Sequence, residues 1–580
     1  MSKLSRRRLL QTSAALGVTG LASHTLGTEV AQSTPDLEKY VQELPIPGVL
    51  EPDEQRDGVD YYNIPITEFD QSLHPDLPDT TVWGFDGSFP GPIIEAQKDE
   101  PIKVEFDNSD LPDEHLLEVD ERVHGTTTEN HMHHDGPVPE VRNSIHFHGL
   151  NIESESDGQS TMWVSPDGVE GPRRTKDVQD VPNAQSRLTG TYHAHTLGIT
   201  RLNAYAGLAG LYYIRSEQEE QLDLPDGEYD IPLVIQARSF TDDGSLDYPD
   251  SFVAEPSHDT AVVNGAIWPY LEVEPRKYRF RIVNGSNHRT FNMNLSNESG
   301  SAVPTMYQYS SGHGFLEDVV AIEDGGDMES LLLTPFERGE VVVDFSEYAG
   351  ETFTLTNDAE FPYMGGNDGE DFPEILQIRV TDPSEEPEDP SADPTTLDLP
   401  APTEIDEDDA VETRHFTLDM EVTDGDGPPI THLLNGYGMG DEGAPVPQPE
   451  LGTTEIWEFE NTTSHAHPMH LHLVDFRVIG RGPDGEADPD PNELGGKDTV
   501  RVEPDETVRI AAEFGDFTGQ YPFHCHALEH EDHKMMLMFD VVEGEGDGDE
   551  GTLTHHDPAD LDHVGDDVDH VIQWEGSIDD

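Results

Sequence analysis

The sequence predicts an all-β protein that contains three homologous domains, and two patterns support this prediction. Short runs such as Ile102–Phe106 and Tyr278–Val283 alternate in polarity, and 52 glycines and 44 prolines punctuate the chain. Alternation with period two between turn residues is typical of β-strands. A turn, a strand and an asparagine also recur as a unit, with Asn108, Asn284 and Asn461 lying 176 and 177 residues apart. A nearly constant period indicates repeated domains, each long enough for one β-sandwich.

Composition divides the chain into further segments. The acidic stretch Asp382–Asp409, which contains six prolines, separates the second repeat from the third, and Ser216–Pro225 separates the first from the second. From about Gly544 onward the chain is acidic and poor in apolar residues, which predicts a flexible tail. We therefore predict an export signal and disordered N-terminus in residues 1–35, three β domains in 36–220, 221–385 and 410–545, a linker in 386–409, and an acidic C-terminal tail in 546–580.

The N-terminus predicts export from the cell. Ser5 is followed by three arginines, Leu9, Leu10 and Gln11, and then by a weakly apolar stretch from Thr12 to Ala22. This pattern is typical of a twin-arginine signal, with a disordered basic tail as the alternative. Twin-arginine export carries folded proteins, often with a cofactor in place, so we expect a secreted protein. Later in the chain no run of about 18 apolar residues occurs, so we expect no membrane insertion of the mature protein.

The charge is strongly negative. The chain has 121 acidic and 31 basic residues, a formal net charge of −90. This excludes binding to nucleic acid or to an anionic membrane, because both require clusters of Lys and Arg. Such a surface suits molar salt, where the Debye length is about 3 Å. We therefore hypothesise a halophilic source, with a merely acidic secreted protein as the alternative.

Histidine pairs suggest metal binding. Four His-x-His triplets occur in well-spaced contexts, and a strand places residues i and i+2 on the same side. Each triplet therefore directs two imidazoles to one point. Neutral imidazole suits copper, and eight imidazoles suffice for three copper ions, which together can deliver electrons to dioxygen. The four pairs are His146 and His148, His193 and His195, His470 and His472, and His524 and His526.

The single cysteine lies inside the last of these triplets. Cys525 would face the side of its strand opposite to the two flanking histidines, so two metal sites could share one strand. Together with His467, His530 and Met535, it makes up the ligand set of a blue copper centre. A buried structural thiol is the alternative. With one cysteine, no intramolecular disulfide can form.

Longer motifs resemble a known family. The segments are Trp83–Pro92, Tyr229–Leu233, Val263–Phe280 and His524–Asp532. In these motifs the chain resembles three-domain multicopper oxidases, close to the bacterial spore-coat laccase and bilirubin oxidase branch, in an acidic, haloarchaeal-type version. The resemblance covers roughly residues 37 to 545. It implies three cupredoxin-like Greek-key β-sandwich domains and four copper ions: one type 1, one type 2 and two type 3.

The resemblance also implies roles for individual residues. It assigns His467, Cys525 and His530 to the type 1 copper, with Met535 as the weak axial ligand. The type 2 copper would be bound by His146 and His470, and the type 3 pair by His148, His193, His195, His472, His524 and His526. Asp157 and Glu531 match acidic residues that bring protons to the trinuclear centre, with a solvated surface role as the alternative.

The implied function is that of a laccase. A small aromatic substrate, a phenol or an aromatic amine, would dock near His467 and lose one electron, and four such electrons would reduce dioxygen to water. We expect a monomer. The alternatives are a bilirubin oxidase, a metallo-oxidase of Cu(I) or Mn(II), a copper nitrite reductase, and, from another class, a secreted copper-binding or coat protein.

Some residues receive no role. His131, His133 and His134 lie in the insert Glu114–Val141, His555 and His556 lie in the tail, and His465 matches no implied ligand. Four Asn-x-Ser/Thr triplets permit glycosylation of an exported chain. They begin at Asn284, Asn294, Asn297 and Asn461.

Overall fold

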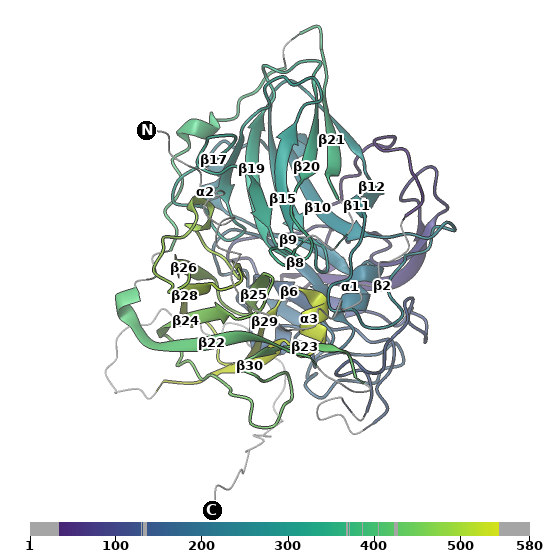
Figure 1. Ribbon diagram of the computed structural model, residues 1–580, viewed down its shortest axis with the longest axis vertical. Coiled ribbons are helices and arrows are strands. Elements are labelled where there is room, and N and C mark those ends of the chain that lie inside the picture. The colour runs from purple at the N-terminus through teal and green to yellow at the C-terminus, as the bar shows by residue number, and fades with distance from the viewer. Residues whose placement is uncertain are drawn as a thin grey trace, which may run out of the picture. The chain divides into compact units, whose positions relative to one another are not determined.

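The chain forms β-strands in three successive segments, and each segment supplies two sheets (Figure 1). The computed structural model describes residues 34–544, apart from 129, 131–135, 367–368, 370–371, 386, 404, 406 and 423–426. The predicted tail 546–580, almost all of the export signal and His131, His133 and His134 therefore lie outside the described residues. The prediction of an all-β protein is confirmed. The predicted domain boundaries stay a prediction.

The first segment contains the N-terminal pair of sheets. One sheet has the order β1 (Glu54–Arg56), β2 (Val59–Gln71), β5 (Ile102–Asp107), β7 (Val178–Val181), and β3 (Thr80–Phe85) also pairs with β2. The other has the order β4 (Ile94–Gln97), β9 (Ala209–Arg215), β8 (Leu188–Ala194), β6 (Ile145–His148). Buried aromatic residues, among them Trp83, Phe147 and Tyr192, form the core of this segment.

The second segment forms a seven-stranded and a five-stranded sheet. The seven-stranded sheet has the order β12 (Ala266–Ile267), β11 (Thr260–Val263), β10 (Asp230–Arg238), β14 (Lys277–Asn284), β19 (Arg338–Asp344), β16 (Met306–Ser310), β17 (Val320–Ile322). The five-stranded sheet has the order β13 (Tyr270–Val273), β21 (Glu374–Val380), β20 (Thr352–Asn357), β15 (Phe291–Ser296), β18 (Leu331–Leu333).

The third segment, like the first, forms a five-stranded and a four-stranded sheet. One sheet has the order β23 (Ile430–Leu434), β22 (Ala410–Val422), β24 (Thr454–Asn461), β28 (Thr507–Glu513), β26 (Phe476–Gly480). The other has the order β27 (Thr499–Val502), β25 (His467–Leu471), β29 (Gly519–Cys525), β30 (Met536–Val541).

The same local structure recurs at each copy of the repeated sequence pattern. The strand at or just before the repeat asparagine pairs in parallel with an earlier strand in all three segments, as β2–β5, β10–β14 and β22–β24. The turn residues Asp86, Asn264 and Asn435 have φ values of 50°, 50° and 53°, and each is followed by a glycine that also has positive φ. Left-handed pairs of this kind favour Asn-Gly and Asp-Gly, which explains why the sequence pattern repeats.

Among the described residues, helices are few and short. They are α1 (Thr200–Ala206), α2 (Glu217–Glu220) and α3 (Leu528–Asp532), with 3₁₀ turns η3 (Ser154–Ser156), η4 (Gly227–Tyr229), η5 (Pro394–Thr396), η6 (Glu407–Asp409) and η7 (Pro491–Glu493). Within the described part of the chain, none of the helices is long and apolar enough to cross a membrane. Helices α1 and α3 pack together beside β6, β8, β25 and β29 (Figure 1), where the predicted site residues lie.

Candidate copper centres

Two strand pairs bring the eight predicted histidines of the trinuclear centre together. In the first segment, β6 pairs with β8 so that His146 lies opposite His193. In the third segment, β25 pairs with β29 so that His470 lies opposite His524. The eight side chains are at most 1% exposed. Each His-x-His pair lies on or at the end of a strand, and both of its imidazoles are buried.

In each imidazole one ring nitrogen, here called the inner nitrogen, faces the other histidines, and the outer nitrogen faces away from them. The inner nitrogens form three groups. Within each group the candidate ligand atoms lie within 4.8 Å of one another, and the groups are His146, His148 and His470; His148, His193 and His526; and His195, His472 and His524. Nδ1 of His148 lies 3.2 Å from Nε2 of His526, and Nε2 of His472 lies 3.2 Å from Nε2 of both His195 and His524.

The outer nitrogens determine which inner nitrogens are free to bind a metal. Nδ1 of His146 lies 2.7 Å from the carbonyl oxygen of Asp157, Nδ1 of His193 lies 2.9 Å from that of Ala194, and Nδ1 of His470 lies 2.8 Å from that of Asp498. A carbonyl oxygen only accepts hydrogen bonds, so these Nδ1 atoms carry the proton. Their Nε2 atoms are buried without a partner. Neutral imidazoles held in this way are the usual metal ligands of proteins.

Asp157 contacts two of these histidines. Its carbonyl accepts from His146, and its carboxylate oxygen Oδ2 lies 2.9 Å from Nδ1 of His472. The residue follows the turn η3 and is fully buried. Burial raises the pKa of the Asp157 carboxyl well above its ordinary value. The predicted proton carrier therefore lies at the centre and is not a surface residue.

Glu531 lies beside two other histidines of the cluster, His195 and His524. Helix α3 places its carboxylate 3.0 Å from Nδ1 of His195 and 3.2 Å from Nδ1 of His524. Burial acts to raise the pKa of Glu531, but the two imidazoles outweigh it and hold the pKa well below its usual range. The environments of the two acidic residues thus shift their pKa values in opposite directions.

Asp498 is a site residue that the sequence analysis missed. Its Oδ1 atom lies 2.9 Å from Nε2 of His148, and its carbonyl accepts from His470. Arg338 donates to both carboxylate oxygens, at 2.6 and 2.5 Å, and Nε2 of His313 lies 2.8 Å from Oδ2. Because His148, Arg338 and Asp498 come from three different segments, only the folded chain brings them together.

The predicted mononuclear site also assembles. The Cys525 sulfur lies 3.5 Å from Nδ1 of His467 and 3.6 Å from Nδ1 of His530. Met535 is fully buried in the same core cluster as Cys525. Burial raises the pKa of the Cys525 thiol, with no cation among the described residues beside it to favour the thiolate. A bound cation would supply the missing stabilisation.

The residues present fit copper at both places. One site offers a sulfur and two imidazole nitrogens at nearly equal separations, with a buried thioether in the same cluster, which is the donor set of a blue copper site. The other offers the buried Nε2 atoms of His146, His193 and His470, which have no partner, while the Nδ1 atoms of the same rings are already hydrogen-bonded. Burying unpaired polar nitrogens costs free energy unless a ligand compensates, and a cluster of metal ions would do so.

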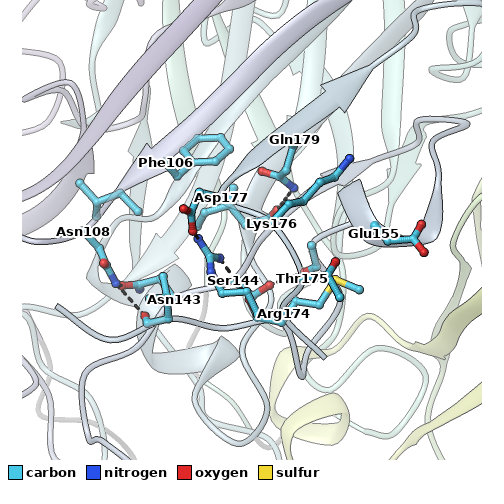
Figure 2. A pocket seen from close by; sticks show the side chains of 15 residues that line it. Phe106, Asn108, Asn143, Ser144, Glu155, Arg174, Thr175, Lys176, Asp177 and Gln179 are labelled. Atoms are coloured by element: carbon cyan, nitrogen blue, oxygen red, sulfur yellow. Dashed lines mark hydrogen bonds and ion pairs between the residues drawn. The ribbon is translucent and has the colours of Figure 1, made fainter. Parts of the chain in front are cut away.

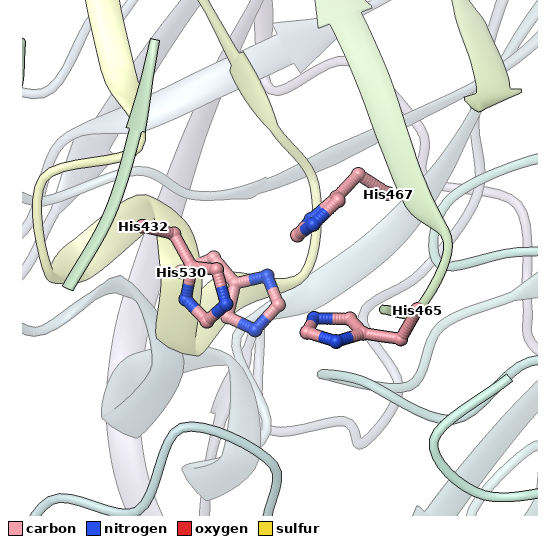
Figure 3. Close-up of side chains that lie close together, drawn as sticks. All are labelled: His432, His465, His467 and His530. Carbon is pink, nitrogen blue, oxygen red and sulfur yellow. The ribbon is translucent and has the colours of Figure 1, made fainter. Parts of the chain in front are cut away.

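Additional histidines, to which the sequence analysis gave no role, surround the mononuclear site. His432 and His465 join His467 and His530 in a group whose candidate ligand nitrogens lie within 4.8 Å of one another (Figure 3). His465 is two residues before His467, and His432 lies on β23, more than thirty positions earlier. An i, i+2 spacing to His467 was a signal for His465, whereas no local pattern predicts His432.

A small pocket in the first segment lies outside these centres. Its lining includes Phe106, Asn108, Ser144, Arg174 and Lys176 (Figure 2). Its volume of about 30 Å³ holds about one water molecule, far less than the several hundred Å³ that a drug-sized ligand needs. We therefore place no substrate there.

The structure restricts the glycosylation sites. The side-chain nitrogens of Asn284 and Asn461 are buried, and each donates two hydrogen bonds to main-chain carbonyls. The folded chain therefore excludes glycans at these two positions. Asn294 and Asn297 are partly exposed.

Comparisons with known proteins agree with the two candidate copper centres described above. Residues 67–141 and 407–545 match two models of multicopper oxidases. A laccase from Haloferax volcanii is 62% identical over 94% of this chain and 92% of its own length. A laccase from Bacillus subtilis is 39% identical over 87% of this chain and 99% of its own. The crystal structure of a multicopper oxidase from Aquifex aeolicus superposes with a TM-score of 0.69 at 28% identity, covering 87% of this chain and all of the other.

Proposed function

The chain belongs to the multicopper oxidase family and is a laccase-type oxidase; from this premise we propose that it binds four copper ions and oxidises phenols and aromatic amines one electron at a time. The family confirms the resemblance drawn from the motifs, and with it the cupredoxin-like fold. Dioxygen and a reducing substrate are the reaction partners. The number of copper ions, the substrate class and the roles of single residues are our proposals.

We assign the residues to the metal ions as follows. His467, Cys525, His530 and Met535 hold the type 1 ion, and His146 and His470 hold the type 2 ion. The type 3 ions are held by two sets of three histidines: His148, His193 and His526, and His195, His472 and His524. When bound, copper supplies reversible one-electron transfer and the site of dioxygen reduction.

One tripeptide connects the two centres, and this observation carries the proposal. His524 and His526 belong to the two proposed type 3 sets, one to each. Cys525, which lies between them in the sequence, contacts His467 and His530. Electrons taken from the substrate at the Cys525 end therefore have a short covalent route to the histidine cluster. Four electrons and four protons convert one dioxygen to two waters, which explains why acidic residues accompany the cluster.

We propose that electrons enter at the imidazole of His530, whereas the sequence predicts docking near His467; both side chains are fully buried. Nε2 of His467 lies 2.8 Å from the Thr463 hydroxyl, whereas Nε2 of His530 has no hydrogen-bond partner. Glu255, which is partly exposed, lies 4.0 Å from that atom. We propose that aromatic substrates approach from the Glu255 side.

Residues that hold protons complete the assignment. Asp157 can hold a proton beside His472 and release it into the cluster, while Glu531 stabilises His195 and His524 electrostatically from 3.0 and 3.2 Å. The carboxylate of Asp498 does the same for His148.

The test is the variant Cys525→Ser. We expect loss of the intense visible absorption and of phenol-dependent oxygen uptake, because the hydroxyl cannot replace the thiolate as a copper ligand. Copper analysis should give three ions where the parent has four. The exposed His415 provides a control, since His415→Gln should keep colour and activity. Continued phenol oxidation by Cys525→Ser would contradict the proposal.

Further proposals concern where the protein works. Twin-arginine export, secretion, a halophilic source and glycosylation at Asn294 or Asn297 are supported by the sequence patterns described above, and we propose a monomeric state.

A further inference from the structure

One turn of the second segment lies against the proposed trinuclear centre, although this segment supplies none of its histidines. The turn runs from Thr334 to Arg338, between β18 and the start of β19. The side chains of Phe336 and Arg338 are at most 2% exposed. Phe336 has a φ of 61°, a strained value for an aromatic residue, and such strain is concentrated at functional sites. The chain thus accepts strain to hold this turn in place.

The ring of Phe336 packs on one of the two type 3 ligand sets. Its centroid lies 4.3 Å from that of His526, 4.5 Å from that of His193 and 5.9 Å from that of His148. It lies at 27° to the rings of both His526 and His148. These three histidines are the whole of one set, so a single side chain restrains the rings of all the ligands proposed for one ion.

Arg338 acts on the same set through Asp498. Its guanidinium binds both carboxylate oxygens of Asp498, with Nη1 2.6 Å from Oδ1 and Nη2 2.5 Å from Oδ2. Oδ1 lies 2.9 Å from Nε2 of His148, whose Nδ1 faces Nε2 of His526 at 3.2 Å. Because an ionised carboxylate only accepts hydrogen bonds, it keeps the proton of His148 on Nε2 and leaves Nδ1 free for a metal ion.

Two main-chain contacts fix the direction of the same guanidinium. Nε of Arg338 donates to the carbonyl oxygen of Thr189 at 3.0 Å, on the strand β8 that also carries His193. Nη1 donates to the carbonyl oxygen of Phe336 at 3.2 Å. The planar fork of an arginine has donors in fixed directions, which a lysine lacks. Arg338 therefore connects the first segment to the carboxylate of the third.

The surroundings leave Arg338 and Asp498 little freedom to move. A Cβ atom at Gly149 would lie 2.7 Å from Oδ2 of Asp498, and one at Gly312 would lie 2.8 Å from Nη2 of Arg338. Both glycines have positive φ, 91° and 114°, which suits glycine. Nε2 of His313 also lies 2.8 Å from Oδ2 of Asp498. Close packing on several sides thus holds the pair in one place.

We propose that Arg338 and Phe336 are positioning residues through which the second segment holds one type 3 ligand set. Arg338 acts on His148 by way of Asp498 and determines which ring nitrogen faces the metal. Phe336 restrains the ring planes of all three histidines. This inference deepens the proposed function, because it rests on the assignment of these histidines to copper.

The other type 3 set has a different support. Asp157 lies beside His472. Glu531 lies beside His195 and His524. These two acidic residues belong to the first and third segments. A change in the turn of the second segment should therefore weaken one ion of the pair and leave the other bound.

The experiment compares copper binding by the parent holoenzyme and by Arg338→Lys. Lysine keeps a positive charge beside Asp498 but cannot bind both of its oxygens and Thr189 together. Dialysis against a chelator-buffered copper series should show one ion bound about tenfold or more weakly, the usual effect of losing a partner behind a ligand. EPR should gain the signal of an isolated Cu(II) ion, because the remaining type 3 ion has lost the partner that cancelled its spin. The visible absorption that reports copper at Cys525 should not change.

Arg187→Lys is the matched control. Arg187 forms a buried ion pair with Glu340 at 2.7 Å, and Glu340 follows Arg338 by two residues on β19. This variant should keep four copper ions and the EPR spectrum of the parent, even where its Tm falls. Phe336→Leu keeps an apolar side chain but removes the flat ring, and it should weaken the same ion as Arg338→Lys. It tests the inference if the arginine variant does not fold.

Two results would overturn the inference. One is Arg338→Lys or Phe336→Leu protein that binds all four ions with the affinities and the EPR spectrum of the parent. The other is loss of the same ion in Arg187→Lys, since any broken ion pair between the segments would then suffice. A parent holoenzyme without a coupled copper pair would instead contradict the proposed function, so the two failures are distinguishable.

Discussion

His148 is oriented differently from most of the other histidines of the proposed trinuclear centre. It directs Nδ1 towards His526, and its Nε2 faces Asp498, whereas His146, His193 and His470 donate from Nδ1 and leave Nε2 free. The difference follows from the partner, because a histidine binds metal through whichever nitrogen its hydrogen-bond acceptor leaves free.

The sequence could predict the ligands but not these partners. His-x-His spacing is a local signal that a strand converts directly into two imidazoles on one side. Asp498, in contrast, is 160 positions from Arg338 and 350 positions from His148, so no pattern along the chain connects them. Their contact depends on how three segments pack, which composition and period do not specify.

At the residue scale, Asp157→Asn should slow turnover while preserving the copper sites. Asparagine keeps the main-chain carbonyl that orients His146 and a side-chain oxygen beside His472, but it cannot release a proton. Because the pKa of Asp157 is raised by burial, the parent's rate should fall as pH rises through that pKa. We expect kcat to drop by about tenfold or more, with loss of this pH limb.

Oxygen uptake with a phenol across pH, together with copper content, measures the effect. Asp167→Asn, at a solvent-exposed turn of the same segment, is a control. A variant with full copper and the parent's kcat at every pH would show that Asp157 carries no proton in the reaction.

At the scale of elements, β29 and α3 carry many of the side chains of the candidate copper centres. Strand β29 and the residue after it carry His524, Cys525 and His526, and α3 returns His530 and Glu531 to the same place within a few residues. The main-chain N–H of Cys525 donates to the carbonyl of Met535 at 3.0 Å, and that of Met535 donates to His530 at 2.8 Å. This local closure explains why the motif at residues 524–532 could be recognised from the sequence alone.

The turn η7 provides a prediction about stability. Glu493 closes a capping box with Asp490 and accepts from Arg481 Nε and Nη2 at 2.6 and 2.5 Å. Burial acts to raise the pKa of Glu493, but Arg481 outweighs it and lowers the pKa from 4.5 to about 2. A depressed carboxyl pKa stabilises the fold above pH 4.5, and this contribution is lost as pH falls towards 2.

Glu493→Gln should therefore lower the free energy of unfolding at neutral pH by about 3 kcal/mol. The difference from the parent should shrink between pH 4.5 and 2, because both proteins then carry an uncharged group at this position. Urea unfolding at several pH values measures this, with the exposed Glu486→Gln as the control. A difference that stays constant across this range would mean that the charge of Glu493 does not matter.

At the scale of the whole molecule, many of the described basic residues are buried. At least eleven of the arginines in the described part of the chain are buried, many of them in ion pairs such as Arg187 with Glu340 at 2.7 Å. Net charge alone could not reveal this, because it does not say where the charges lie. With 31 basic residues in total and so many inside, the exposed face is more acidic than the average composition.

This distribution predicts strong dependence of stability on salt. Repulsion between surface carboxylates acts over about 10 Å at 0.1 M salt and about 3 Å at 1 M, whereas buried pairs are little screened. Dilution therefore strengthens the repulsion without strengthening the buried attraction. We expect Tm to rise by roughly 10 °C or more between 0.1 M and 3 M KCl, with phenol oxidase activity lost first at low salt.

The control for this prediction is the Bacillus subtilis laccase in the same KCl series, because salt also stabilises proteins by exclusion from their surfaces. A second control separates surface charge from fold: six exposed carboxylates, changed to amides together, should reduce the rise in Tm. Suitable positions are Glu51, Asp79, Asp113, Asp324, Glu486 and Asp488. If this chain and the Bacillus laccase gain equally from salt, the acidic surface is not an adaptation to brine, and the hypothesis of a halophilic source fails with it.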